Sequence, residues 1–402
     1  MSEKLSLRSL PIKGSRVLMR VDFNVPLDDH ANITSDSRLV AALPSIKYVL
    51  EGGGSLVLMS HLGRPKGERK PEFSLRPVAK RLSELLDQDV MMAPDCIGEE
   101  VEALAETLKP GQVMLLENLR YYAAEEKPDK DPSFAQQLAK LGDLYVNDAF
   151  GTAHRVHSST VTVASYFPSK AAAGFLMEKE IQFLGDAILK PQRPFYAIIG
   201  GSKVSTKIGV IKSLMKKVDA LFIGGGMIFT FAKAQGISIG DSIFEADFLD
   251  TAKEILKACQ SENVPMYFPD DVVAADAFSN DANIKVVSMS EGIPKGYRGL
   301  DVGPETIKLF SSKLSDAATI LWNGPLGVFE FSNFAKGSVD MAKVLATLPA
   351  TVIVGGGDTL AVVDNAGVTS KMSHLSTGGG ACLEYLEYGS LPAVEALAEK
   401  TV

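Results

Sequence analysis

The sequence has only three cysteines in 402 residues, Cys96, Cys259 and Cys382. They are odd in number and far apart, and their spacing is not that of a metal site. Disulfides are rare in the cytosol, where thiols stay reduced. The simplest interpretation is a soluble, cytoplasmic protein with free thiols.

Long apolar runs and an excess of basic residues are also missing. The N-terminal segment MSEKLSLRSLPIKGSRV is polar, so no signal peptide is expected. No apolar run approaches the length of a membrane-spanning helix. The net charge is -8 and the pI about 5.3, which disfavours a general nucleic-acid binder.

Two familiar nucleotide-binding signatures are absent as well. The chain contains neither G-x-x-x-x-G-K-[ST] nor G-x-G-x-x-G. The first absence argues against a P-loop protein. The second argues against a nicotinamide dehydrogenase, although such an enzyme would share parallel sheets.

Short apolar runs alternate with longer amphipathic segments along the whole chain. Runs such as SLVLMSH and ATILWNG are typical of buried strands, and DSRLVAALPSIKYVLEGG is typical of a helix. Continuous apolar strands separated by helices predict an α/β fold with parallel sheets covered on both faces. The length favours two domains, 1–172 and 173–389, because the residues that follow the strands change in character near residue 172. The segment 174–190 predicts a connecting helix.

Charged side chains follow the predicted strands of the first half. Ligands of open α/β sheets bind beyond the carboxyl ends of the strands, and arginine suits bidentate contacts to phosphate or carboxylate. Each residue alone is compatible with a solvated loop charge, and Asp22 is equally compatible with a structural role. Together they predict a site for a small, highly anionic ligand. The residues are Asp22, Asn24, Arg38, His61, Arg64, Arg120 and Arg155.

Glycine-rich turns follow the predicted strands of the second half, in GGSKVSTK, IGGGM, WNGPLGVFE and VGGGDT. Glycine permits tight turns on structural grounds alone, but four such turns predict a nucleotide with a polyphosphate tail. Lys203 and Lys207, four residues apart at a predicted helix start, should share one face. Glu330 can accept hydrogen bonds from ribose hydroxyls.

The turn VGGGDT carries an aspartate where a phosphate site would usually carry a lysine. Asp358 would repel a phosphate directly, but it can hold a magnesium ion that bridges the phosphates. It can also be the N-cap of the following helix. Both roles are compatible.

Taken together, RVDFNVP, SHLGRPKG, LLENLR, NDAFGTAHR, GGSKVSTKI, LWNGPLGVFE, GGGDT and HLSTGGGA resemble the phosphoglycerate kinase family. The motifs occur in that family's order and cover essentially the whole chain. The resemblance implies two Rossmann-like three-layer domains facing each other across a cleft, joined by a hinge helix. It also implies that residues 390–402 pack back onto the first domain. Cys382 and Ala393 depart from the serine and glycine expected there.

The resemblance implies reversible phosphoryl transfer between ATP and the carboxylate of 3-phosphoglycerate, giving ADP and 1,3-bisphosphoglycerate, in a monomer that needs Mg²⁺. The seven residues of the first half would bind phosphoglycerate, with Arg38, Lys203 and Lys207 catalytic and Asp358 on the metal. The nucleotide would be held by Lys207, Glu330, Gly356, Gly357, Asp358 and Thr359. A carboxylate is already ionised at neutral pH, so the lack of an evident nucleophile–base pair fits this chemistry.

A two-domain small-molecule binding protein could share the α/β layout. It would not need a lysine pair beside a magnesium-binding aspartate. An ATP titration with and without magnesium, together with a phosphoglycerate assay, separates the two interpretations.

Overall fold

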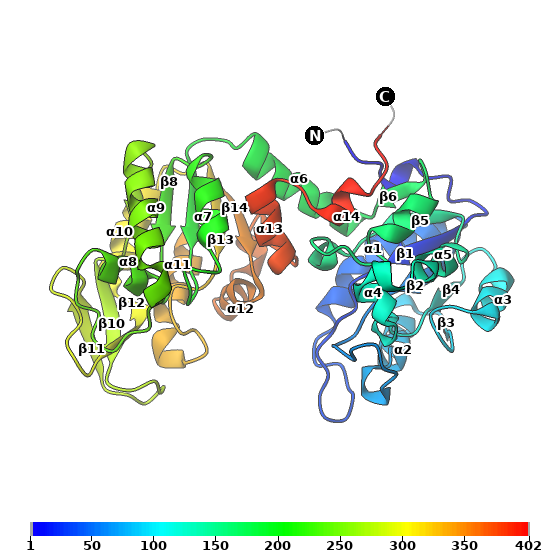
Figure 1. Cartoon of the computed structure of the whole chain (residues 1–402), viewed down its shortest axis with the longest axis horizontal. Helices are drawn as coiled ribbons and strands as arrows, with labels where there is room; N and C mark the ends of the chain where they lie inside the picture. Colours follow the sequence, from blue (N-terminus) through cyan, green and yellow to red (C-terminus); the bar gives the residue numbers. More distant parts are fainter. Residues whose placement is uncertain (1–2, 401–402) are drawn as a thin grey trace. The chain divides into compact units, whose positions relative to one another are not determined.

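The computed structural model describes residues 3–400, with the backbone alone for 186–189. The described chain forms two compact units. The first runs up to Gln182 and resumes at Ser390, and the second runs from Phe183 to Gly389. Each unit contains a parallel sheet with helices packed around it (Figure 1). The division falls inside helix α6 (Phe175–Leu189), which lies C-terminal to the change of sequence character near residue 172.

The first unit contains a six-stranded, fully parallel sheet in the order β3-β4-β2-β1-β5-β6. Its strands are β1 (Arg16–Arg20), β2 (Ser55–Met59), β3 (Val90–Met92), β4 (Val113–Leu115), β5 (Leu144–Asn147) and β6 (Ala171–Ala173). The helices are α1 (Ser37–Glu51), α2 (Arg76–Leu86), α3 (Glu99–Thr107), α4 (Ala123–Glu126) and α5 (Ser133–Ala139). Every residue of β2 is buried, as expected for a central strand covered on both faces.

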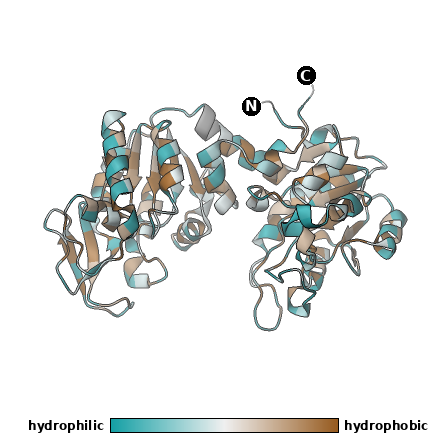
Figure 2. Cartoon of the chain, viewed as in Figure 1, coloured by the Kyte–Doolittle hydropathy of each residue, from teal (hydrophilic) through white to brown (hydrophobic). Residues whose placement is uncertain are grey.

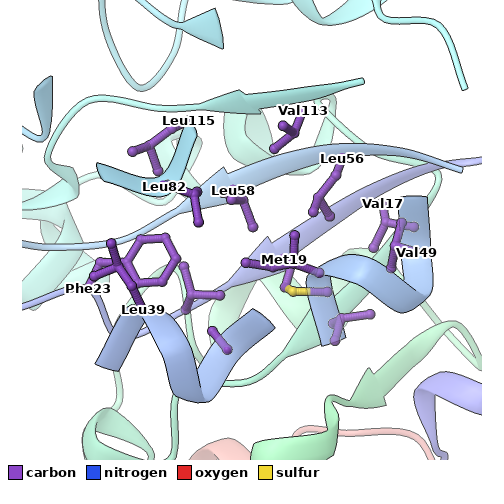
Figure 3. Close-up of a cluster of buried hydrophobic side chains, with 14 of the residues drawn as sticks. Val17, Met19, Phe23, Leu39, Val49, Leu56, Leu58, Leu82, Val113 and Leu115 are labelled. Carbon is purple, nitrogen blue, oxygen red and sulfur yellow. The ribbon is translucent and has the colours of Figure 1, made fainter. Parts of the chain in front are cut away.

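One face of this sheet packs against α1 and α2. Figure 3 shows the resulting cluster, in which apolar side chains of the strands meet those of the two helices. Its members include Val17, Met19, Phe23, Leu39, Val49, Leu56, Leu58, Leu82, Val113 and Leu115. This core fixes the strands, and with them the loops at their carboxyl ends.

The second unit contains another six-stranded parallel sheet, in the order β15-β14-β13-β7-β8-β9. Its strands are β7 (Phe195–Ile199), β8 (Ala220–Ile223), β9 (Met266–Tyr267), β13 (Thr319–Asn323), β14 (Thr351–Gly355) and β15 (His374–Ser376). The helices are α7 (Ile208–Met215), α8 (Ile228–Ala234), α9 (Leu249–Ser261), α10 (Pro304–Leu314), α11 (Lys336–Leu345), α12 (Gly357–Asn365) and α13 (Gly380–Tyr388). Both parallel sheets were predicted from the apolar runs. Figure 2 shows those runs as apolar strands beside more polar helices.

A third sheet was not predicted. Strands β10 (Asp271–Ala275), β11 (Ile284–Ser288) and β12 (Arg298–Val302) form an antiparallel sheet in the order β11-β10-β12. β11 is largely exposed and β12 contains charge and glycine, so neither resembles the apolar runs of the parallel sheets.

The C-terminal segment belongs to the first unit. Short helix α14 (Pro392–Glu395) follows Ser390, and the Ala393 amide donates to the Ala153 carbonyl at 3.0 Å. The Ala398 amide likewise donates to the Ala171 carbonyl at 2.9 Å. Ala393 and Cys382, the two departures from the family pattern, are both fully buried. Among the described residues, no helix has the length and apolar character needed to cross a membrane.

Candidate active site

The predicted anion-binding residues of the first unit follow the carboxyl ends of its strands. Asp22 and Asn24 follow β1, and His61 and Arg64 follow β2. Arg120 comes after β4, and Arg155 comes after β5. Because β4, β2, β1 and β5 are adjacent and parallel, these loops emerge at one edge of the sheet.

Arg38, in the first turn of α1, forms an ion pair with Asp22. In this structure Asp22 holds the guanidinium of Arg38. The Arg38 side chain keeps 37% of its surface exposed, so its remaining donors can reach a ligand.

Asn24 and Arg120 hold the turn that carries Arg64. The Gly63 amide donates to Asn24 Oδ1 at 2.8 Å, and Arg120 donates to the Gly63 carbonyl at 2.8 Å. Arg64 itself is exposed beside this turn. Arg155 donates through Nε to His154 at 3.2 Å.

A buried polar network supports these residues, and the sequence did not reveal it. Arg20 is fully buried and donates through Nε to Ser159 at 2.8 Å. Ser159 donates in turn to the buried Glu125 carboxylate at 2.6 Å. Arg20 also contacts His61 Nδ1 at 3.1 Å. The only signal for Arg20 was a basic residue inside the apolar run VLMRVDF, and Glu125 gave no signal.

The network sets the charge state of the imidazoles. Burial, together with Arg20, Arg120 and Arg38, holds the pKa of His61 well below its ordinary value. Burial and neighbouring arginines lower the pKa of His157 to about 3. Because arginine only donates, His61 Nδ1 accepts and the proton of the neutral ring sits on Nε2. The arginines therefore supply the positive charge, and His61 supplies a neutral hydrogen-bond donor.

In the second unit, Lys203 and Lys207 do not share a helix face, so that expectation was wrong. Helix α7 begins only at Ile208, and a hydrogen-bonded turn precedes it, with the Lys207 amide donating to the Val204 carbonyl at 2.8 Å. The turn leaves Lys203 exposed and Lys207 buried.

Lys207 donates to Asn323 Oδ1 at 2.5 Å, at the end of β13. Burial lowers the pKa of Lys207 to about 8, although Asp358 acts in the opposite direction. The sequence singled out the WNG turn only for its glycine. Nothing in the sequence indicated that Asn323 would accept a hydrogen bond from Lys207. A buried ammonium group of this kind is suited to binding an anionic ligand, because the ligand replaces the solvation that the ammonium group has lost.

The four glycine turns surround one cavity of about 610 Å³. Its walls include Glu330 and Asp358, as expected, and side chains that the sequence did not single out. The latter are Ser202, Ile228, Phe229, Ile243, Phe278, Arg298, Leu300 and Asp301. The volume is that of a site for a drug-sized or nucleotide-sized ligand.

Backbone contact between two of the turns explains why they need glycine. Gly324 has φ +99°, and a Cβ there would lie 2.3 Å from the Gly200 carbonyl oxygen. The WNG and IIGG turns thus touch backbone to backbone at the cavity wall. Thr359 stabilises the same corner, since its hydroxyl accepts from the Gly324 amide at 2.7 Å.

Asp358 is not the N-cap of its helix. Gly356, with φ +93°, occupies the N-cap position of α12, and Asp358 lies exposed in the first turn without a capping hydrogen bond. Gly357 begins the helix. The helix N-terminus and the exposed Asp358 carboxylate therefore lie at the same end of α12 without competing for one role.

Among the side chains that the structure describes, no cluster of three or more metal-binding residues exists. Magnesium does not require one, because it usually binds one or two carboxylates together with substrate phosphates. Asp358, exposed and lining the cavity, fits that requirement.

Comparison with known proteins agrees with this arrangement. The model of the phosphoglycerate kinase family matches residues 7–388. A protein named phosphoglycerate kinase from Chlorobium phaeobacteroides is 54% identical over 398 residues, covering 98% of this chain and 99% of its own. Phosphoglycerate kinase 3, cytosolic, of Arabidopsis thaliana is 55% identical over 397 residues, covering 98% of each.

Two solved structures are similar over the same length. Phosphoglycerate kinase from Coxiella burnetii has a TM-score of 0.88 and 41% identity, covering 98% of both chains. The enzyme from Pyrococcus horikoshii has a TM-score of 0.84 and 32% identity, with 98% of both chains covered.

Proposed function

Since this chain belongs to the phosphoglycerate kinase family of phosphotransferases, we propose that it transfers a phosphoryl group reversibly between ATP and the carboxylate of 3-phosphoglycerate. The products are ADP and 1,3-bisphosphoglycerate. The family match over nearly the whole chain carries this proposal. The chemistry of both sites supports it.

The first unit binds the phosphoglycerate. Its residues for this purpose are Asp22, Asn24, Arg38, His61, Arg64, Arg120 and Arg155. The arginines neutralise the phosphate and carboxylate, and neutral His61 donates a hydrogen bond. Asn24 and Arg120 act mainly by holding the turn at Gly63, as their hydrogen bonds indicate.

The second unit binds the nucleotide. Glu330 faces the ribose, and the N-terminus of α12 at Gly356, Gly357 and Thr359 faces the phosphates. Lys207 and Lys203 supply positive charge from the turn before α7. Asp358 holds Mg²⁺, which neutralises phosphate charge when bound.

The acceptor carboxylate needs no general base, because it is already ionised at neutral pH. Catalysis then consists of in-line positioning and stabilisation of the charge on the transferring group. Arg38 from one unit and Lys203 and Lys207 from the other provide it. The two sites lie in different units, so we further propose that transfer occurs in a closed cleft between them.

The test is a coupled assay of 3-phosphoglycerate phosphorylation, with and without magnesium. The proposal requires magnesium-dependent ADP formation that also depends on 3-phosphoglycerate. ADP formation independent of phosphoglycerate, or none at all, contradicts it.

We also propose that the enzyme works as a cytoplasmic monomer, since one chain carries both sites. Relatives named cytosolic are among the similar proteins, although one is named chloroplastic. Light scattering during gel filtration measures the mass, and a dimer would contradict the proposal.

A further inference from the structure

The short helix α4 of the first unit carries two consecutive glutamates, Glu125 and Glu126. Glu125 is fully buried, whereas the Glu126 side chain keeps 37% of its surface exposed. Neither belongs to the residues proposed to contact phosphoglycerate. Each carboxylate is nevertheless connected to one buried arginine beside those residues.

Glu125 reaches its arginine, Arg20, through Ser159. The Ser159 hydroxyl donates to Glu125 Oε1 at 2.6 Å and the Ser159 amide donates to Oε2 at 3.0 Å, so both carboxylate oxygens hold this serine. The same hydroxyl accepts from Arg20 Nε at 2.8 Å. A hydroxyl has one proton, which Ser159 gives to the carboxylate, and its lone pairs therefore face the arginine.

Arg20 connects this carboxylate to His61. Its guanidinium is fully buried, donates to the Val21 carbonyl and contacts His61 Nδ1 at 3.1 Å. Burial raises the pKa of Glu125, and the attraction of Arg20 opposes that shift. A buried cation without a compensating charge is costly, so the carboxylate stabilises the guanidinium in this place. The guanidinium in turn keeps the proton of the neutral imidazole on Nε2.

Glu126 acts on a second arginine, Arg120. Its Oε1 lies 3.3 Å from Arg120 Nε, in an ion pair whose arginine side chain is only 5% exposed. Arg120 donates to the Gly63 carbonyl at 2.8 Å, in the turn that carries Arg64. Burial lowers the pKa of Arg120 and Glu126 opposes this shift, as expected of a compensating charge.

We propose that Glu125 and Glu126 are positioning residues for phosphoglycerate binding. Glu125 orients, through Arg20, the imidazole of His61. Glu126 orients, through its own arginine partner, the turn at Gly63. This inference rests on the proposed function of the first unit. Because both carboxylates act on groups that bind phosphoglycerate before and during transfer, their loss should raise the KM for phosphoglycerate more than it lowers kcat.

The experiment measures the steady-state kinetics of Glu125→Gln and Glu126→Ala. A hydrogen bond to a charged group changes an equilibrium constant by about tenfold to a hundredfold, and a displaced donor keeps part of it, so the KM for 3-phosphoglycerate should rise at least about fivefold in each variant. The KM for ATP should not change. An unchanged KM for 3-phosphoglycerate, or an equal rise for both substrates, overturns the proposal.

The first unit offers a matched control for each variant. Glu117, like Glu125, is buried and accepts from a serine hydroxyl and a backbone amide, both at 3.0 Å. Glu84, like Glu126, forms an ion pair with an arginine, Arg81 on α2. Glu117→Gln and Glu84→Ala should keep the wild-type KM for 3-phosphoglycerate. A rise as large in the controls would mean a general loss of structure and would contradict positioning.

A second measurement tests the connection without any turnover. Ser159→Ala removes the group between Glu125 and Arg20, and Ser158→Ala is its control, since that buried hydroxyl donates to a backbone carbonyl at 2.8 Å. In ¹⁵N NMR of the ligand-free protein, Ser159→Ala should move the Nδ1 resonance of His61 toward that of an imidazole nitrogen without a hydrogen bond. Ser158→Ala should leave it in place.

An Nδ1 resonance that Ser159→Ala does not move would contradict the orientation of His61 by Glu125. The NMR result also separates this inference from the proposed function. A wild-type protein that shows the expected resonances but does not phosphorylate 3-phosphoglycerate would refute the proposed function and leave the orientation of the imidazole standing.

Discussion

Arg38 combines partial exposure with an ion pair to Asp22, which points its guanidinium without burying it. Arg38→Ala should therefore leave the fold intact and lower kcat by about 10³ to 10⁵, the range for arginines that stabilise a transferring phosphoryl group. Steady-state kinetics measure the loss. A variant that keeps more than about a tenth of kcat has lost only about 1.4 kcal/mol, too little for this role.

Arg81 offers a matched control for Arg38. It lies in the same unit, on α2, and pairs with Asp36 and Glu84 on the surface. Arg81→Ala removes an arginine–carboxylate pair of the same kind, and Arg81 is not among the predicted site residues, although its partner Asp36 precedes the helix that carries Arg38. It should leave kcat unchanged.

We expect Lys207 to make nucleotide binding depend on pH. Its pKa is lowered by burial to about 8, so its ammonium loses the proton as pH rises through that value. The KM for the nucleotide should rise severalfold between about pH 7 and 9.5, because phosphate attraction is lost. Lys207→Met should show a high KM with little pH dependence. The exposed Lys203 gives the control, because Lys203→Arg should keep the wild-type pH profile.

The free energy of unfolding should also depend on the ionisation of Lys207, but it should rise with pH where nucleotide affinity falls. A lysine whose folded pKa lies below its unfolded value, 10.5, contributes stability above the unfolded pKa. That contribution is lost as pH falls through about 8. The free energy of unfolding should thus gain from Lys207 in the pH range where nucleotide affinity falls.

Residue types were easier to predict from the sequence than residue partners. The sequence placed Asp22, His61 and Arg120 at strand ends because apolar runs mark where strands stop. It missed Arg20, Glu125 and Asn323, whose roles depend on contacts between distant segments. Such contacts leave no periodic pattern in the chain.

At the scale of elements, the parallel sheets were predictable because each strand is a continuous apolar run. The antiparallel sheet was not, since Arg298 and Gly299 interrupt β12. The prediction that Lys203 and Lys207 share a helix face failed for a related reason. Spacing alone predicts a shared face only inside a helix, and α7 begins one residue after Lys207.

Asp301, one of the residues that line the cavity, joins β12 to α11. Its carboxylate accepts from the Gly337 amide at 2.7 Å and from the Val302 amide at 2.9 Å. Burial raises its pKa to about 7, although these hydrogen bonds oppose the shift. On α11, Asp340 raises the pKa further and Lys336 lowers it.

Because the pKa of Asp301 is raised in the folded state, its carboxyl group contributes stability that is fully present below the unfolded pKa of 3.8. That contribution is lost as pH rises through about 7. The second unit should therefore weaken across this range. Asp301→Asn should abolish that slope, at a cost of about 1–3 kcal/mol for the missing acceptor. Fluorescence of Trp322, the only tryptophan and a β13 residue, follows unfolding of this unit. Asp340→Asn should keep most of the slope, and an unchanged slope in Asp301→Asn would assign the titration to another group.

At the scale of the whole molecule, the proposed reaction assigns one of its two sites to each unit. The arginines belong to the unit that ends at Gln182, and the nucleotide cavity belongs to the unit that begins at Phe183. Transfer needs reacting atoms about 3 to 3.5 Å apart. It also needs water kept from the activated phosphoryl group. If the transfer proceeds as proposed, both conditions require the two units to close on their ligands.

Helix α6 contains the division between the units, so we expect it to act as the hinge. Closure should need both ligands, because each site carries positive charge that only its own anionic ligand neutralises. Small-angle scattering of the free, singly liganded and doubly liganded protein measures this through the radius of gyration. The smallest radius is expected with phosphoglycerate and nucleotide together, and the singly liganded forms should stay close to the free protein. A radius that is the same in all four states, under conditions where the enzyme turns over, would leave transfer without a closing motion and refute the hinge.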